Sequence, residues 1–279
     1  MAKEGLPSIY DYTLDELKEK LKPSFRAKQV YNWLYKKYAN SYDEMKNIPN
    51  ELKEDLKANY PIDVMEIVKK EQSIDGSIKY LFKLRDNHTV EAVLLLMKDK
   101  KKDEDGNIVR SEKYTVCISS QVGCKVGCTF CLTAKGGFVR NLTVGEYIAQ
   151  IVNIKRDNDI AENKALNIVY MGMGEPLDNF ENFIKAVSIF SELDGLAISR
   201  RRQTVSTSGI ASKIEKLGQI DLGIQLAISL HAVDDELRSE LIPMNKAYNI
   251  ASIIDAVKKF PIDTRKKVMF EYLVIKNKN

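Results

Sequence analysis

The spacing of apolar residues divides the chain into three zones. Residues 1–70 have the spacing of amphipathic helices. Val30, Trp33 and Leu34 fall on one helical face. Two capping boxes, in which Ser or Thr precedes Glu by three positions, are formed by Thr13 with Glu16 and by Ser41 with Glu44. We expect a small helical domain here.

The second zone, residues 71–112, is predicted to consist of antiparallel strands that link the other two zones. SIKYLFKL (77–84) follows an Asp-Gly turn, and TVEAVLLLM (89–97) is rich in β-branched and aliphatic residues. The charged run at 98–107 is predicted to be an exposed hairpin loop. We assign that loop no function.

Strand and helix patterns alternate from residue 113 to residue 279. Five largely apolar segments are predicted strands: 113–119, 166–172, 203–208, 224–230 and 268–275. Helical patterns lie between them, and the first is opened by a capping box of Thr143 with Glu146. Repeated βα units with right-handed crossovers form an open doubly wound sheet or a barrel, so the predicted fold class is α/β.

Composition and charge narrow the class of protein. The apolar fraction is 44% and the charged fraction is 29%, as in ordinary soluble globular proteins. The first residues, MAKEGLPSIYDY, lack the apolar core of a signal peptide, and no apolar run reaches membrane-spanning length, so we expect a cytoplasmic protein. A net charge of +4 permits an RNA partner without requiring one. Basic residues of the helical zone form either a solvated surface, which we favour, or an arm for nucleic acid: Arg26, Lys28, Lys36 and Lys37.

Small, hydroxylated and ionisable residues follow several of the predicted strands. The carboxyl ends of parallel strands are where α/β proteins place their chemistry. Gly172, Gly174 and Glu175 lie at or just after the end of the second predicted strand. The third predicted strand ends in Ser206, Thr207, Ser208 and Gly209, and the fourth ends in Ser229, Leu230 and His231. Each group alone more often makes a turn or caps a helix. Together with the cysteines that follow the first strand, they favour a ligand site.

All four cysteines lie within CISSQVGCKVGCTFC, residues 117–131. Cys124, Cys128 and Cys131 have the spacing C-x3-C-x2-C, and Cys117 stands upstream at the end of a predicted strand. In a reducing cytoplasm, clustered cysteines suggest a metal rather than disulfides. A structural zinc site needs four ligands, whereas three thiolates can hold a cubane iron–sulfur cluster and leave one iron open. The spacing therefore favours a cluster.

The longer motifs resemble a known family. C-x3-C-x2-C after the first barrel strand, with GMGEP after the second, is similar to the radical S-adenosylmethionine superfamily. The chain resembles the RlmN family more closely still, and this family methylates C2 of adenosine in 23S ribosomal RNA and in transfer RNA. The matching stretches, in chain order, are PSFRAKQVYNWLY, CISSQVGCKVGCTFC, GMGEPLDN, TVSTSGI and AISLHAVDDELRSELIPMN. The resemblance covers nearly the whole chain, and it implies a partial (β/α) radical S-adenosylmethionine barrel over residues 113–279.

The resemblance assigns site residues through matching motif positions. It implies that Cys124, Cys128 and Cys131 ligate a [4Fe–4S] cluster whose free iron chelates S-adenosylmethionine. It implies further cofactor contacts: Gly174, Glu175, Ser206, Ser229, Leu230 and His231. Glu91 matches the acceptor of the adenine C2 proton, and Cys117 matches the resolving cysteine that forms a disulfide as the product leaves. Without the resemblance, Glu91 would be an ordinary solvent-facing carboxylate.

The chemistry of the target explains the need for a radical. Adenine C2 carries an electrophilic C–H and cannot attack a methyl cation as an amine would. The resemblance implies that the cofactor is cleaved to a radical, and that a methyl group is first placed on a C-terminal cysteine and then added to C2 as a carbon radical. It implies as partners 23S ribosomal RNA outside the mature ribosome, transfer RNA and a low-potential electron donor such as flavodoxin, with the protein acting as a monomer.

The chain departs from the family in one respect. Family members continue through a further strand, a cofactor-contacting asparagine and the methyl-carrying cysteine, whereas no cysteine of this chain follows Cys131. The 279 residues alone are therefore expected to bind S-adenosylmethionine weakly, if at all, and to methylate no RNA, whereas the complete gene product is expected to do so by the route above. Two alternatives stay open. One is a C8-methylating enzyme of the antibiotic-resistance type, and the other is a non-catalytic RNA-binding remnant with a structural metal.

Overall fold

The chain folds into two compact units, each assembled from several stretches of sequence. The computed structural model describes residues 5–98, 101–102, 108–110, 112–262 and 268–279. Unit one comprises Met1–Ile118, Thr143–Ile168 and Ile184–Ser199, and unit two comprises Ser119–Leu142, Val169–Phe183 and Arg200–Asn279. The division cuts across the three consecutive zones expected from the sequence, because stretches of the third zone, including helix α5 (Val144–Asp157), belong to unit one.

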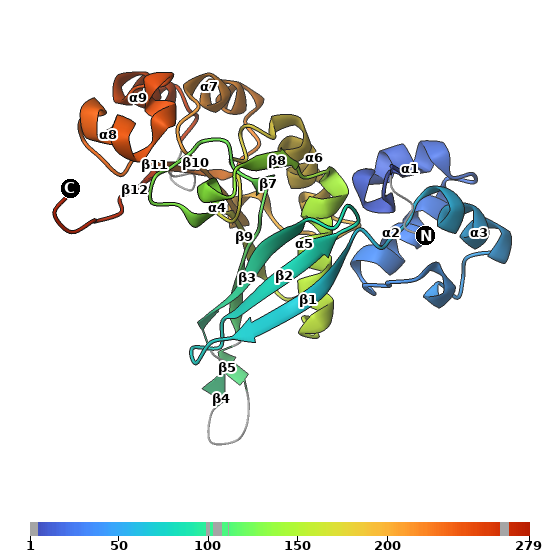
Figure 1. Cartoon of the computed structure of the whole chain (residues 1–279). Helices are drawn as coiled ribbons and strands as arrows, with labels where there is room; N and C mark the ends of the chain where they lie inside the picture. The colour runs from blue at the N-terminus through green and yellow to red at the C-terminus, as the bar shows by residue number, and fades with distance from the viewer. Residues whose placement is uncertain (1–4, 99–100, 103–107, 111, 263–267) are drawn as a thin grey trace. The chain divides into compact units, whose positions relative to one another are not determined.

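Unit one begins with helices, as the apolar spacing predicts (Figure 1). They are η1 (Ile9–Asp11), α1 (Leu14–Lys20), α2 (Phe25–Tyr35), η2 (Tyr42–Glu44) and α3 (Asn50–Asn59). The capping box of Thr13 and Glu16 is present at the start of α1. The box predicted at Ser41 is not formed. The hydroxyl of Ser41 accepts from the backbone N–H of Asp43, and Glu44 accepts from that of Asn40, because this segment makes only one 3₁₀ turn.

Antiparallel strands follow in unit one. β1 (Met65–Gln72), β2 (Ile78–Leu84), β3 (Thr89–Lys98) and β6 (Lys113–Cys117) are neighbours in this order, and each pair is antiparallel. β9 (Leu166–Tyr170) follows β6 in the sheet and contributes residues to both units. β1 starts within the zone 1–70 that we expected to be helical, because pairing with β2 outweighs its local pattern. β4 (Lys101–Lys102) pairs with β5 (Ile108–Arg110) as a hairpin would, while residues 99–100 and 103–107 of the predicted loop lie outside the described residues.

Unit two contains the strand–helix repeats. β10 (Gln203–Thr207), β11 (Gln225–Ser229) and β12 (Val268–Glu271) pair in parallel in this order. The helices are α4 (Leu132–Lys135), α7 (Ala211–Ile220), α8 (Asp235–Leu241), η4 (Pro243–Lys246) and α9 (Ile250–Lys258), while α6 (Phe180–Ser191) contributes to both units and η3 (Arg200–Arg202) precedes β10. The predicted α/β class with a partial barrel is confirmed. In the described stretches, no helix is long and apolar enough to cross a membrane.

Candidate active site

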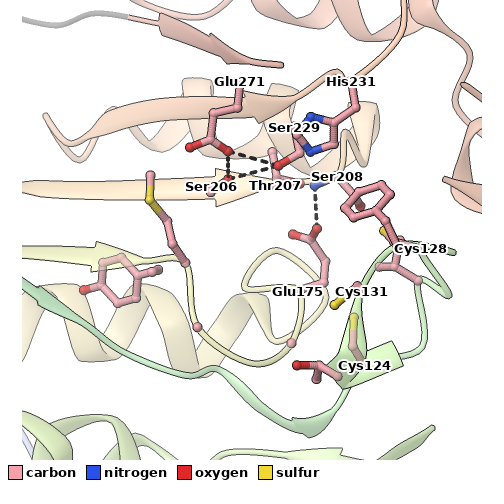
Figure 2. Close-up of a pocket in the computed structure, with 17 residues that line it drawn as sticks. Cys124, Cys128, Cys131, Glu175, Ser206, Thr207, Ser208, Ser229, His231 and Glu271 are labelled. Atoms are coloured by element: carbon pink, nitrogen blue, oxygen red, sulfur yellow. Dashed lines mark hydrogen bonds between the residues drawn. The ribbon is translucent and has the colours of Figure 1, made fainter. Parts of the chain in front are cut away.

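A cavity of about 250 Å³ lies at the carboxyl ends of the strands of unit two (Figure 2). The predicted residues that line it are Cys124, Cys128, Cys131, Gly174, Glu175, Ser206, Ser229 and His231. Leu230 is not part of the lining. Its backbone N–H donates to the carbonyl of Glu271 at 3.1 Å, so its place is in the strand end behind the cavity.

The cysteines sit on a loop that a short antiparallel ribbon closes at its base. β7 (Gln121–Gly123) pairs with β8 (Phe138–Asn141), and the three cysteines lie in the connection between them. The backbone N–H of Cys124 donates to the carbonyl of Gly137 at 2.9 Å. Gly123 has φ of +75°, and a Cβ there would lie 1.9 Å from that carbonyl oxygen. The loop can therefore close only with glycine at this position.

The thiols of this loop are the donor set for a metal. Burial raises the pKa of Cys124 to about 11 and that of Cys128 to about 12, so both are neutral thiols until a metal displaces the proton. Among the described residues, no three Cys, His, Asp or Glu side chains converge closely enough to hold a single ion. In a cubane cluster each cysteine binds a different iron, so the thiols do not have to converge. This donor set fits a cluster better than zinc.

An apolar backing covers the inner side of the cysteine loop. Four buried residues pack against Cys124 and Cys128: Val126, Ala232, Leu241 and Ile242. The backbone N–H of Thr129 also donates to the carbonyl of Leu241 at 3.0 Å, which ties the loop to the end of α8. Such a backing excludes water from one side of the thiols, as an oxygen- and water-sensitive metal group requires.

The Ser-Ser-Gln sequence between Cys117 and Cys124 shapes the opposite wall. The backbone N–H of Ser120 donates to the carbonyl of Met173 at 2.7 Å, and the backbone N–H of Glu175 donates to Oε1 of Gln121 at 2.9 Å. Gly174 has φ of +100°, and a Cβ there would lie 2.5 Å from Cβ of Gln121. Glycine at this position therefore lets the loop approach β7.

Glu175 is a buried carboxylate that backbone groups hold in place. Only 3% of the residue is exposed. One carboxylate oxygen accepts from the backbone N–H of Ser208 at 2.7 Å and the other from that of Leu177 at 3.0 Å. Burial raises its pKa, and no lysine or arginine of the described chain pairs with it. A buried carboxylate without a cation is costly, so the cavity favours a ligand with an ammonium group.

Glu271 is a site residue that sequence reasoning missed. Its Oε2 accepts from the hydroxyls of Ser206 at 2.9 Å and Ser229 at 3.1 Å (Figure 2). Ser229 and Glu271 are directly paired in the β11–β12 register. The fifth predicted strand runs to residue 275 and places Glu271 in its middle, whereas the observed strand β12 ends at Glu271. The sequence pattern therefore did not mark this residue as a strand end.

His231 is held in a strained backbone position beside the cavity. Its φ is +59°, and its Nδ1 accepts from the backbone N–H of Leu273 at 3.1 Å. Because Nδ1 is the acceptor and burial lowers the pKa of the ring, the imidazole is neutral with its proton on Nε2. Phe130 packs edge-on against this ring, with the centroids 5.2 Å apart. A donor nitrogen is thus presented from the cavity lining.

Glu91 and Cys117 belong to unit one, outside the cavity lining. Val93 of β3 lies opposite Cys117 of β6, so the pleat puts Glu91, Val93 and Cys117 on one face of the sheet. Glu91 and Cys117 are diagonal neighbours on that face and are half-buried. An oxygen of Glu91 lies 3.4 Å from Nζ of Lys79.

Comparisons with known proteins agree with each other. Residues 118–279 match the family model of the radical SAM superfamily, and residues 10–62 match the ribosomal RNA large subunit methyltransferase N-terminal domain. The chain is 91% identical over 279 residues to the dual-specificity RNA methyltransferase RlmN of Aliarcobacter butzleri, covering 100% of this chain and 78% of that protein. The RlmN of Wolinella succinogenes is 66% identical over 272 residues, covering 98% and 76%. A crystal structure of a radical SAM methyltransferase from Sphaerobacter thermophilus matches with a TM-score of 0.88 at 40% identity, covering 98% and 78%.

Proposed function

Because the chain belongs to the RlmN family of dual-specificity RNA methyltransferases, within the radical SAM superfamily, we propose that it methylates C2 of adenosine in 23S ribosomal RNA and in transfer RNA. The observation that carries the proposal is that one cavity gathers three thiols with a buried carboxylate that pairs with no lysine or arginine of the described residues. Three thiols beside a buried carboxylate suit an iron–sulfur cluster that binds a ligand with an ammonium group.

Some residues of the cavity would bind an iron–sulfur cluster, and others would bind S-adenosylmethionine. A [4Fe–4S] cluster with S-adenosylmethionine supplies, when bound, the one-electron cleavage that yields a carbon radical able to react at an unactivated C–H. Cys124, Cys128 and Cys131 would hold the cluster, since all three line the cavity. Glu175 would accept hydrogen bonds from the ammonium group, and its fixed carboxylate would keep that end of the cofactor in one orientation.

Glu91 and Cys117 would act on the substrate side. Glu91 would take the proton from adenine C2 at a carboxylate oxygen. The thiol of Cys117 would lose its proton and attack the sulfur that links the product to the methyl-carrying cysteine of the family. The carbon–sulfur bond would then break, the released carbon would take a proton to become the methyl group, and a disulfide would join the two cysteines. The diagonal placement of Glu91 and Cys117 on one sheet face supports a joint role, because one nucleotide could reach both groups. The ion pair with Lys79 holds the carboxylate of Glu91 on this face of the sheet.

The proposal also includes RNA and an electron donor as partners, a cytoplasmic location, and a monomeric protein. Reduction of a cluster requires a low-potential donor, for which flavodoxin is our candidate. The basic side chains of the helical zone lend RNA binding no separate support, since three have partners within unit one: Arg26 with the carbonyl of Asn47, Lys28 with Asp194, and Lys36 with the carbonyl of Leu193. Exposed contacts of this kind are weak, so phosphates could replace them.

Deleting the gene tests the function directly. We expect 2-methyladenosine to disappear from 23S ribosomal RNA and transfer RNA of the host, measured by mass spectrometry of nucleosides. The wild-type gene should restore it, and the gene carrying Cys128→Ala should not. Unchanged 2-methyladenosine would refute the proposal, and loss of 8-methyladenosine instead would establish the C8-methylating alternative.

The Glu175→Gln variant tests the ammonium site. An amide cannot offer a charged acceptor, so we expect the Kd for S-adenosylmethionine to rise by about 10- to 100-fold. Isothermal titration of the anaerobically reconstituted protein measures this. Glu181→Gln is the control, because Glu181 is exposed and pairs with Lys216 at the surface. An unchanged Kd in the Glu175 variant would remove this residue from the cofactor site.

A further inference from the structure

The segment that carries the three cysteines has a second side, which is exposed and lies outside the lining of the cavity. Its apolar residues with large exposed fractions are Leu132 at 80%, Val139 at 50% and Phe138 at 39%. Lys135, in the last turn of α4, is exposed as well. We call these four residues the outer loop face. They lie outside the cavity lining, whereas Phe130 of the same segment belongs to it.

The outer loop face lies next to the proposed ligands of the cluster. Leu132 directly follows Cys131 in the chain, and consecutive Cα atoms are about 3.8 Å apart. Phe138 pairs with Gly123, the residue before Cys124, in the β7–β8 register. A partner protein that rests on this face would therefore be one or two residues away from two of the three thiols. It would not have to enter the cavity.

The charge around the outer loop face is positive. Residues 119–142 contain three basic residues and no aspartate or glutamate. Lys125 forms an ion pair with Asp178 at 2.8 Å, which offsets one of these charges, but its side chain is still 50% exposed. Its Nζ lies 5.5 Å from the centroid of the Phe138 ring, so the lysine borders the apolar residues. Exposed apolar side chains beside basic ones suit an acidic protein partner.

The proposed function has two macromolecular partners, the RNA and the electron donor, and the side chains favour the donor for this face. Surfaces for single-stranded RNA combine phosphate contacts with aromatic rings on which bases stack. Leu132 and Val139 offer neither, and Lys125 lies over the ring of Phe138. An apolar centre with a polar rim is typical of protein interfaces, and electron-transfer complexes use small ones, below about 1,200 Å².

We propose that the outer loop face is the docking surface for an acidic, low-potential electron-carrier protein. The proposal rests on the proposed function, because it concerns reduction of that same cluster. Electron transfer slows steeply with distance, so the carrier has to sit where the protein surface is nearest to the cysteines. One electron leaves the carrier and enters the cluster, and no covalent bond forms or breaks. The lysines attract the carrier, and the apolar side chains hold it in contact.

Binding of an acidic flavodoxin to the anaerobically reconstituted protein tests the proposal. Leu132→Ser and Lys135→Glu should each raise the Kd by about 5- to 20-fold, measured by isothermal titration. The Kd of the wild-type protein should also rise with salt, because salt screens the charges. Leu193→Ser is the matched control for the leucine, since Leu193 is also 80% exposed, and Lys246→Glu is the control for the lysine, since Lys246 is exposed on η4. Both controls should leave the Kd unchanged.

Reduction of the cluster separates this proposal from the proposed function. Dithionite is a small reductant that needs no docking surface, so it should bleach the cluster absorption of the Leu132 and Lys135 variants as it does that of the wild type. Reduced flavodoxin should bleach the variants more slowly. Unchanged flavodoxin binding in both variants would overturn the proposal. Weaker binding of a short adenosine-containing RNA, with flavodoxin binding unaffected, would also overturn it and identify an RNA surface. A wild-type protein that forms no iron–sulfur cluster would instead overturn the proposed function, together with the proposal that depends on it.

Discussion

Cys128→Ala is expected to abolish iron binding by the anaerobically reconstituted protein, while Cys117→Ala retains about four irons per chain. Cys128 lines the cavity with the two other thiols of the loop, and two thiolates are too few to hold a cubane. Cys117 instead lies at the end of β6, in the other compact unit. Iron and sulfide analysis, with the absorption spectrum, measures the difference.

The matched pair makes this experiment decisive. Both variants remove one thiol and both residues are partly buried, so general damage to the fold would affect them alike. Loss of iron in the Cys117 variant would mean that Cys117 is a ligand. Bound zinc and a colourless wild-type protein would support the remnant with a structural metal.

Arg238→Met should lower the free energy of unfolding by at least about 3 kcal/mol. Arg238 is fully buried in α8, and its guanidinium donates to carbonyl oxygens of Ser208 at 2.6 Å, Ser229 at 3.1 Å and, through Nε, Leu230 at 3.0 Å. Methionine fills similar space but leaves these carbonyls without a donor. Urea unfolding of the metal-free protein measures the change.

Two further variants show whether the loss comes from these hydrogen bonds. Arg238→Lys should fall between wild type and Arg238→Met, because one ammonium cannot reach the carbonyls of both strand ends as the planar guanidinium does. Lys246→Met removes a positive charge from an exposed position on η4 and should change the stability by less than about 0.5 kcal/mol. A loss below about 1 kcal/mol in Arg238→Met would show that water replaces the guanidinium.

Local signals in the sequence were reliable where the structure also depends on local contacts. The capping boxes at Thr13 and Thr143 form because both partners lie within one helical turn. The box at Ser41 fails since the segment does not continue as an α-helix. β1 was placed in the helical zone because its charged sequence, MEIVKKEQ, has no strong strand pattern. Its pairing with β2 is a contact that only the folded chain reveals.

The sequence predicted those residues of the candidate site that lie at the ends of recognisable strands. Parallel pairing brings the ends of β10 and β11 together, so Ser206 and Ser229 meet as their positions suggest. Glu271 was missed because a single glutamate in an apolar strand is more simply explained as a solvent-facing residue. Its partners come from two other strands, and that information is not contained in any local pattern.

The side chain of Gln121 limits what substitution data can reveal about this cavity. Its Oε1 accepts from the backbone of Glu175, while its Nε2 donates to Oδ1 of Asn141 at 2.8 Å and to Oδ2 of Asp178 at 2.9 Å. Glutamate would lack the donors, and asparagine would be one carbon too short. Gln121 is therefore as hard to replace as a residue that touches the cofactor, although it is absent from the cavity lining. In this loop, intolerance to mutation does not by itself identify a ligand contact.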